Sequence, residues 1–293
     1  MLKEDSRRDL KDDNLNSLLP DVQVDRRGFV AACIAAGFAV TAEPILAQAI
    51  KTSMDGLEGG DVKIGEIPAY YAVPKGKGKR PVVLVVAEIW GNHEHIKDVV
   101  RRLAKAGYFA VSNEPYFRIG DLTKMENIKE VIAAANKLSD LQAFEDLDRV
   151  YTWATKHPRA DASRLGITGF CRGGRMVWMY TAHNKKIDAG VAWYGSLMPI
   201  PPAMPTGPLD VTDKIDRPVL GLYGGADQGI PLEHVERLKA GLKAFGNDRK
   251  SQIHVYEGMP HAFNADYRPS YRKEAADDGW KRMLAWFKKH GVA

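Results

Sequence analysis

The chain has 293 residues and a net charge of +5, and 45% of its residues are hydrophobic. This is ample apolar material for the core of one large α/β domain or two small ones. Its two cysteines leave little room for a disulfide framework, and it has no basic block with interleaved aromatic residues that would indicate nucleic acid binding.

The N-terminal segment has the pattern of an export signal. Twin arginines at 26–27 precede a short apolar stretch at 29–40, and small residues at 47–49 form an A-x-A cleavage site. These three features predict a twin-arginine signal peptide at 1–49. The apolar stretch is shorter than the ~20 residues of an ordinary membrane span. We therefore expect export to the periplasm without stable membrane insertion; an internal helix or an uncleaved anchor is the alternative.

Predicted strands and helices alternate after this signal, within one domain at 50–293. The apolar run at 81–87 is typical of a parallel strand covered on both faces, and the spacing at 96–105 gives one apolar helical face. The expected strands are a short pair within 63–73, then 81–87, 108–112, 165–170, 189–194, 219–223 and 252–256. The expected helices are 96–105, a helical region at 126–156, a helix from about 173, then 232–245 and 271–290. This succession predicts an α/β fold with a mostly parallel central sheet, helices on both faces and no large cap domain.

A candidate nucleophile lies where an expected strand meets an expected helix, in the sequence Gly-Phe-Cys-Arg-Gly-Gly at 169–174. A glycine on each side of a central nucleophile is the pattern of a nucleophile elbow, a strained turn that exposes the central side chain above the carboxyl edge of the sheet. Here that residue is Cys171, and the start of the following helix stabilises a thiolate. Taken alone, a cysteine is more often a small buried hydrophobic residue.

A thiol nucleophile needs a base, and usually a group that orients the base. Asp227 follows an expected strand and a glycine-rich turn, and His261 follows the next expected strand. Both are at strand ends and in the order nucleophile, acid, histidine that this architecture uses. Alone, Asp227 is more often a turn residue that caps the following helix. Three matches in the right order favour a catalytic set of Cys171, Asp227 and His261.

These motifs resemble those of the dienelactone hydrolases (carboxymethylenebutenolidases), a family of the α/β-hydrolase superfamily. The resemblance runs from about residue 60 to the C-terminus and is carried by the segments 88–91, 113–118, 169–174, 223–227 and 261–263. It implies an α/β-hydrolase fold and a carboxylic ester hydrolase with the triad Cys171, His261 and Asp227.

The resemblance also implies a role for Glu88, which would hold the resting thiol and accept its proton as substrate binds. We expect partial burial to raise the pKa of Glu88 and so let it exchange a proton with a thiol. An ion pair between Glu88 and Arg172 is the alternative. The backbone N–H groups of Ile89 and Arg172 would form the oxyanion hole.

The expected substrate is a small ester or an enol-lactone, anionic or neutral, cleaved through a thioester on Cys171. Arg118 matches a family position that binds the substrate carboxylate. Ala265 and Asp266 occupy the neighbourhood of a second family arginine, with Arg268 slightly later. The expected pocket walls, which ordinary packing would equally explain, are Tyr116, Trp90, Tyr194 and Phe263.

Two other functions remain open. A general carboxylesterase or thioesterase could use the same triad, and a non-catalytic protein could keep the fold as a pocket for a small ligand. No cofactor is expected. His93 and His95 flank Glu94 but do not present both rings on one helical face, so no metal site is expected there.

Overall fold

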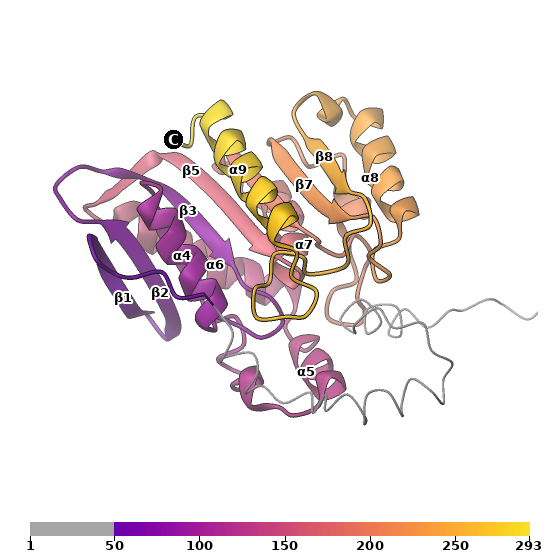
Figure 1. The fold of residues 1–293 in the computed structure, drawn as a ribbon. Helices are drawn as coiled ribbons and strands as arrows, with labels where there is room; N and C mark the ends of the chain where they lie inside the picture. Colours follow the sequence, from indigo (N-terminus) through magenta and orange to yellow (C-terminus); the bar gives the residue numbers. More distant parts are fainter. Residues whose placement is uncertain (1–49) are drawn as a thin grey trace, which may run out of the picture.

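The computed structural model describes residues 50–293, and the signal peptide predicted at 1–49 lies outside this part of the chain. One eight-stranded sheet runs through the molecule in the order β1-β2-β4-β3-β5-β6-β7-β8 (Figure 1). The strands from β4 to β8 in this order are parallel to one another, whereas β2 is antiparallel to both β1 and β4. The sheet is therefore mostly parallel, with an antiparallel hairpin at one edge.

The strands follow the expected apolar runs. β3 is buried along all but its first residue, as expected for a strand with helices on both sides. β1 is buried only at its two ends, so its exposed middle gives little apolar signal, and the strand starts six residues before the predicted pair. The strands are β1 (Leu57–Ile64), β2 (Ile67–Pro74), β3 (Arg80–Val86), β4 (Phe109–Asn113), β5 (Ala160–Phe170), β6 (Ala189–Trp193), β7 (Val219–Gly224) and β8 (Gln252–Tyr256).

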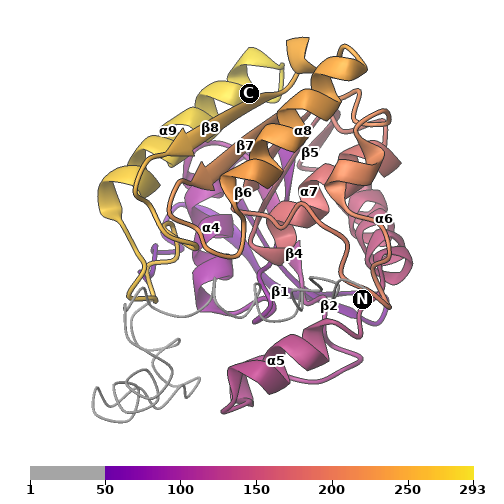
Figure 2. The same cartoon turned by 90° about the vertical axis from the view of Figure 1, so that its right-hand side faces the viewer.

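Helices cover both faces of the sheet. Figures 1 and 2 show α4 and α9 on one face and α6, α7 and α8 on the other. The helices are α4 (Glu94–Lys105), α5 (Ile128–Ala135), α6 (Asp140–Lys156), α7 (Arg172–His183), α8 (Leu232–Ala244) and α9 (Lys273–Lys289), with three short 3₁₀ turns at Leu122–Lys124, Pro208–Val211 and Asn247–Arg249. No large cap domain covers the sheet within residues 50–293. The predicted fold class is confirmed.

The helical region expected at 126–156 is divided into α5 and α6. The backbone leaves the helix after Asn136, and Ser139 starts the second helix by accepting a hydrogen bond from the N–H of Gln142. A serine oxygen at this position accepts a hydrogen bond from one of the first N–H groups of the helix, which have no acceptor within the helix. The break lets α5 lie away from the sheet while α6 packs on it (Figure 2).

Candidate active site

The turn between β5 and α7 has the geometry of a nucleophile elbow. Cys171 has φ 54° and ψ −113°, a strained backbone for a residue with a side chain. A Cβ on Gly169 would lie 2.4 Å from the carbonyl oxygen of Gly173, and one on Gly173 would lie 2.1 Å from the carbonyl oxygen of Val86. Only glycine fits at both positions, which explains the residues that flank Cys171.

A histidine and a carboxylate meet near this turn. The Nδ1 of His261 lies 2.7 Å from Oδ2 of Asp227, and both side chains are buried. The other oxygen of Asp227 accepts hydrogen bonds from the N–H groups of Gly229 and Ile230. Asp227 is therefore held by the turn that follows β7, and it fixes the orientation of the imidazole.

The electrostatics of His261 connect it to the elbow. Burial lowers its pKa, but the charges of Asp227 and Cys171 raise it more, so the pKa rises to about 10. The Nε2 of His261 is buried and has no hydrogen-bond partner within residues 50–293. The structure thus places Cys171, Asp227 and His261 beyond the carboxyl ends of the parallel strands β5, β7 and β8, with Cys171 near enough to raise the pKa of His261.

The predicted oxyanion donors are at the same sheet edge. Ile89 follows β3, and Arg172 is the first residue of α7. Neither backbone N–H donates a hydrogen bond to any acceptor in the described part of the chain. Both amides are therefore available to a developing negative charge beside Cys171.

Of the predicted aromatic walls, Tyr194 packs against His261, and Phe263 packs against Tyr194. The Tyr194 ring centroid lies 5.1 Å from that of His261 and 5.3 Å from that of Phe263. Burial raises the pKa of Tyr194, and the charges of Glu88 and Cys171 add to the rise. Its buried hydroxyl thus lies within the fields of both groups.

The other two aromatic walls line separate cavities. Tyr116 borders a small cavity of about 30 Å³ together with Arg172. Burial raises its pKa, and the charges of Glu88 and Cys171 contribute. Trp90 borders an open cavity of about 510 Å³ with Phe117.

The expected rise of the Glu88 pKa is wrong in sign. Glu88 is 1% exposed, and burial alone raises its pKa, but the neighbouring His93, His95 and Arg268 lower it more, to about 2. Its Oε2 accepts a hydrogen bond from the hydroxyl of Tyr267. Glu88 is therefore an ionised carboxylate at neutral pH.

Arg172 does not pair with Glu88. Its guanidinium contacts the Oδ1 of Asn136 and the sulfur of Met204. The alternative ion pair between Glu88 and Arg172 is therefore wrong, and Glu88 has other partners.

Arg118 is placed differently from the expectation. Its guanidinium lies 2.8 and 3.0 Å from the two carboxylate oxygens of Asp146 and 2.8 Å from Oε1 of Glu66. The guanidinium of Arg118, which was expected to bind a substrate carboxylate, therefore already binds two carboxylates of the protein. The physical reason is that Asp146 faces Arg118 from α6, a pairing that the local sequence does not show.

Tyr267 near the site was missed, and Arg268 was named from the sequence but given no role. Tyr267 contacts Glu88, and Arg268 acts electrostatically on Glu88, Tyr194 and Tyr267. Both belong to the segment that follows His261. The concentration of titratable residues just after the candidate base was a signal that could have identified them.

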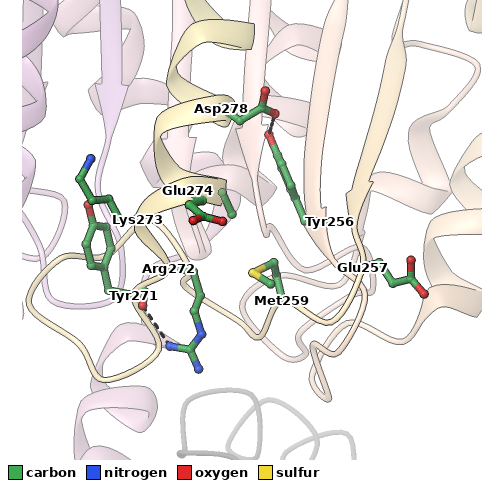
Figure 3. Close-up of a pocket in the computed structure, with 9 residues that line it drawn as sticks. Tyr256, Glu257, Met259, Tyr271, Arg272, Lys273, Glu274 and Asp278 are labelled. Atoms are coloured by element: carbon green, nitrogen blue, oxygen red, sulfur yellow. Dashed lines mark hydrogen bonds between the residues drawn. The ribbon is translucent and has the colours of Figure 1, made fainter.

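A further groove lies away from the triad, between the end of β8 and the start of α9 (Figure 3). It has a volume of about 550 Å³ and is lined by groups of both charges, including Arg272 and Glu274. The Tyr256 hydroxyl donates a hydrogen bond to Asp278 at its upper end (Figure 3). These mixed charges indicate no particular class of ligand.

Neither metal ligands nor a membrane span is evident in the described chain. Residues 50–293 contain no group of three or more His, Cys, Asp or Glu side chains arranged to hold a metal ion. None of the helices in this range is long and apolar enough to cross a membrane.

Comparisons with known proteins agree with the fold and the motifs. Residues 67–291 match the model of the dienelactone hydrolase family. A Methylorubrum extorquens protein provisionally named a carboxymethylenebutenolidase is 49% identical over 289 residues, which cover 96% of this chain and 99% of the relative. A Bradyrhizobium protein provisionally named a 2-oxo-3-(5-oxofuran-2-ylidene)propanoate lactonase is 31% identical over 76% of this chain and 89% of its own length.

A solved structure shows the same fold. The crystal structure of a protein from Klebsiella pneumoniae, provisionally described as a dienelactone hydrolase, matches with a TM-score of 0.76 and 46% identity, over 79% of this chain and 98% of that chain. The chain therefore belongs to the dienelactone hydrolase family and is a hydrolase of lactones or carboxylic esters.

Proposed function

We propose that the enzyme cleaves small esters and enol-lactones with Cys171 as nucleophile, His261 as base and Asp227 as the group that orients the base. The observation that supports this most is the 2.7 Å contact between His261 and Asp227 beside a cysteine in a strained elbow. A non-catalytic binder has no need of all three groups together.

The reaction would run through a thioester. The sulfur of Cys171 attacks the carbonyl carbon, and the N–H groups of Ile89 and Arg172 stabilise the oxyanion; each such donor contributes about 3 kcal/mol. The C–O bond of the ester or lactone breaks, and an enolate or alkoxide leaves. In the thioester the sulfur carries no charge, so one cause of the raised His261 pKa is removed. The imidazole, once neutral, takes a proton from water, whose oxygen attacks the thioester, and the acid and the thiol are released.

Glu88 would serve the first step as a proton acceptor. An ionised, buried carboxylate can take the proton of the Cys171 thiol, whereas a protonated one cannot. A pKa of about 2 makes Glu88 a weak base, so it would hold the thiol proton only until the proton passes to the leaving oxygen.

Arg268 is our candidate for binding the acidic part of a substrate. It follows the candidate base by seven residues and acts on Glu88, Tyr194 and Tyr267. A guanidinium at this place would favour esters and lactones that bear a carboxylate. The lactonase name of the Bradyrhizobium relative includes a carboxylate-bearing lactone, which supports this substrate class.

We also propose that residues 1–49 direct the enzyme through the twin-arginine pathway to the periplasm. The support is the sequence pattern at 26–49. Comparing the mass and compartment of the protein with those of an Arg26→Lys, Arg27→Lys variant tests this; identical processing and location would contradict it.

The test of the proposed chemistry compares wild type with Cys171→Ala on an activated aryl ester and on an aryl lactone. We expect hydrolysis by wild type and a loss of at least a hundredfold in the variant. Rapid acid quenching followed by mass spectrometry should find the acyl group on Cys171. Hydrolysis that persists in Cys171→Ala removes the nucleophile, and no hydrolysis by wild type favours a ligand-binding protein.

A further inference from the structure

A group of buried titratable side chains lies behind Glu88, apart from the triad. We call Tyr267, His93, His95 and Asp266 the Glu88 cluster. The two histidines come from the start of α4, and the other two residues come from the segment after His261. The reaction proposed above uses none of the four.

Two members of the cluster face the same oxygen of Glu88. The hydroxyl of Tyr267 donates a hydrogen bond to Oε2 of Glu88. Nε2 of His93 lies 3.8 Å from that oxygen, too far for a hydrogen bond, and acts on the carboxylate electrostatically. The rings of Tyr267 and His93 pack edge to face, with centroids 4.8 Å apart and an interplanar angle of 83°. Each ring therefore fixes the other.

The other two members fasten the segment to α4. Nδ1 of His95 lies 2.8 Å from Oδ1 of Asp266, and the ring of His95 lies 5.3 Å from that of Tyr267. Asp266 directly precedes Tyr267, so this pair sets where the Tyr267 hydroxyl lies. The further titratable or charged groups acting on the cluster come from neighbouring segments and are Arg268, Tyr194 and Glu88 itself.

A buried carboxylate stays ionised only when donors replace the water that it has lost. Burial lowers the pKa of His93, despite the nearby carboxylate of Glu88, so a neutral imidazole and an ionised Glu88 coexist at neutral pH. The second oxygen of Glu88, Oε1, is buried without a hydrogen-bond partner in the described chain. One oxygen is thus held and the other is able to accept a proton.

We propose that Tyr267 and His93 are positioning residues that keep Glu88 an ionised carboxylate, with Oε1 left to accept the proton of Cys171. His95 and Asp266 hold Tyr267 in place for this purpose. The inference rests on the proposed function, because it assigns the proton to the candidate nucleophile.

The test follows the reaction of Cys171 with iodoacetamide between pH 4 and pH 9, which requires no ester hydrolysis. His93→Gln and Tyr267→Phe are made singly and together, each with and without Glu88→Gln. Without the Tyr267 hydroxyl and the His93 ring, burial should move the titration of Glu88 into the range of about pH 5 to 7. We expect the double variant to gain a step in alkylation rate in that range, and the step to vanish when Glu88→Gln is added. Wild type, with a Glu88 pKa of about 2, should show no Glu88-dependent step.

Tyr271→Phe is the matched control, since it removes a hydroxyl from the same segment at the far groove and should leave the profile unchanged. If the double variant does not fold by circular dichroism, Tyr267→Phe alone is measured by infrared spectroscopy, where we expect the protonated carboxyl band of Glu88 to appear about one pH unit higher than in wild type. No Glu88-dependent step in the folded double variant, or no change in the band in Tyr267→Phe, overturns the inference. Ester hydrolysis that does not depend on Cys171 would instead overturn the proposed function, whatever the alkylation profile.

Discussion

The stability of the elbow helix depends on a buried arginine, and replacing its partner is a sharp test. The side chain of Arg175 in α7 is 0% exposed. Its Nη1 and Nη2 lie 2.6 and 2.8 Å from the two oxygens of Asp140, and Nη2 donates to the carbonyl oxygen of Thr206. Asp140→Ala would leave a buried guanidinium with one neutral acceptor in place of a bidentate carboxylate.

Removing one partner of a buried ion pair typically costs about 3 to 5 kcal/mol, because the remaining charge stays desolvated without compensation. A whole domain of this kind is stable by only about 5 to 15 kcal/mol, so the variant should lose a large share of its stability. The matched control is Glu236→Ala, which breaks an exposed pair with Lys239 whose side chains are 65% and 40% exposed. Such a surface pair contributes less than about 1 kcal/mol.

Urea unfolding followed by tryptophan fluorescence measures both costs. We expect the free energy of unfolding to fall by about 3 to 5 kcal/mol in Asp140→Ala and to change little in Glu236→Ala. Asp140→Asn should fall between them, because an amide keeps one acceptor oxygen but no charge. Equal losses in Asp140→Ala and Glu236→Ala would refute the reasoning that the buried guanidinium depends on this carboxylate.

Three further predictions concern the site. Gly173→Ala places a Cβ 2.1 Å from the carbonyl oxygen of Val86, so we expect its free energy of unfolding in urea to fall by about 3 kcal/mol or more. The control Gly78→Ala, whose Cβ would meet nothing within 4 Å, should change it by less than about 0.5 kcal/mol. Similar losses in the two variants would contradict the crowding argument. The pKa of His261 rises from 6.5 to about 10 on folding. Its protonated form therefore stabilises the fold fully below pH 6.5, and this stabilisation is lost as the pH rises towards 10. The melting temperature of wild type should fall more steeply between these pH values than that of His261→Gln, and parallel curves would count against the raised pKa. Arg268→Gln should lower kcat/KM for carboxylate-bearing esters by about tenfold or more, the effect of a lost charge-assisted contact of about 1.4 kcal/mol. It should change kcat/KM for neutral esters little. Equal losses on both kinds of ester would exclude the carboxylate role.

The fold was predictable because its signals are local. Continuous apolar runs such as β3 identified the parallel strands, and the glycines around Cys171 identified the elbow, since each pattern is set by contacts within a few residues. The hairpin strand β1 was partly missed because its exposed middle has no apolar alternation. The division of the long helical region had a local signal in Ser139, which precedes α6 at a capping position.

The partners of single charges were not predictable in the same way. Arg118 pairs with Asp146 across 28 positions, and Glu88 accepts a hydrogen bond from Tyr267 across 179 positions. Nothing in the flanking residues indicates such partners. The error in the direction of the Glu88 pKa has another cause. Burial could be anticipated from its place after β3, whereas the sequence does not show that His93 and His95, five and seven positions further on, turn their rings close enough to outweigh burial.

The two arginines of α7 limit how the segments around the site can be exchanged to make the enzyme prefer other acyl groups. Arg172 and Arg175, nearly one helical turn apart, contact the α5–α6 junction at 136–140 and the loop segment at 204–206. Two segments distant in sequence are therefore fastened to the same short helix that begins at the nucleophile. A segment transplanted from a relative would need to retain these arginine contacts, or the graft would disturb the elbow as well as the pocket that it was meant to alter.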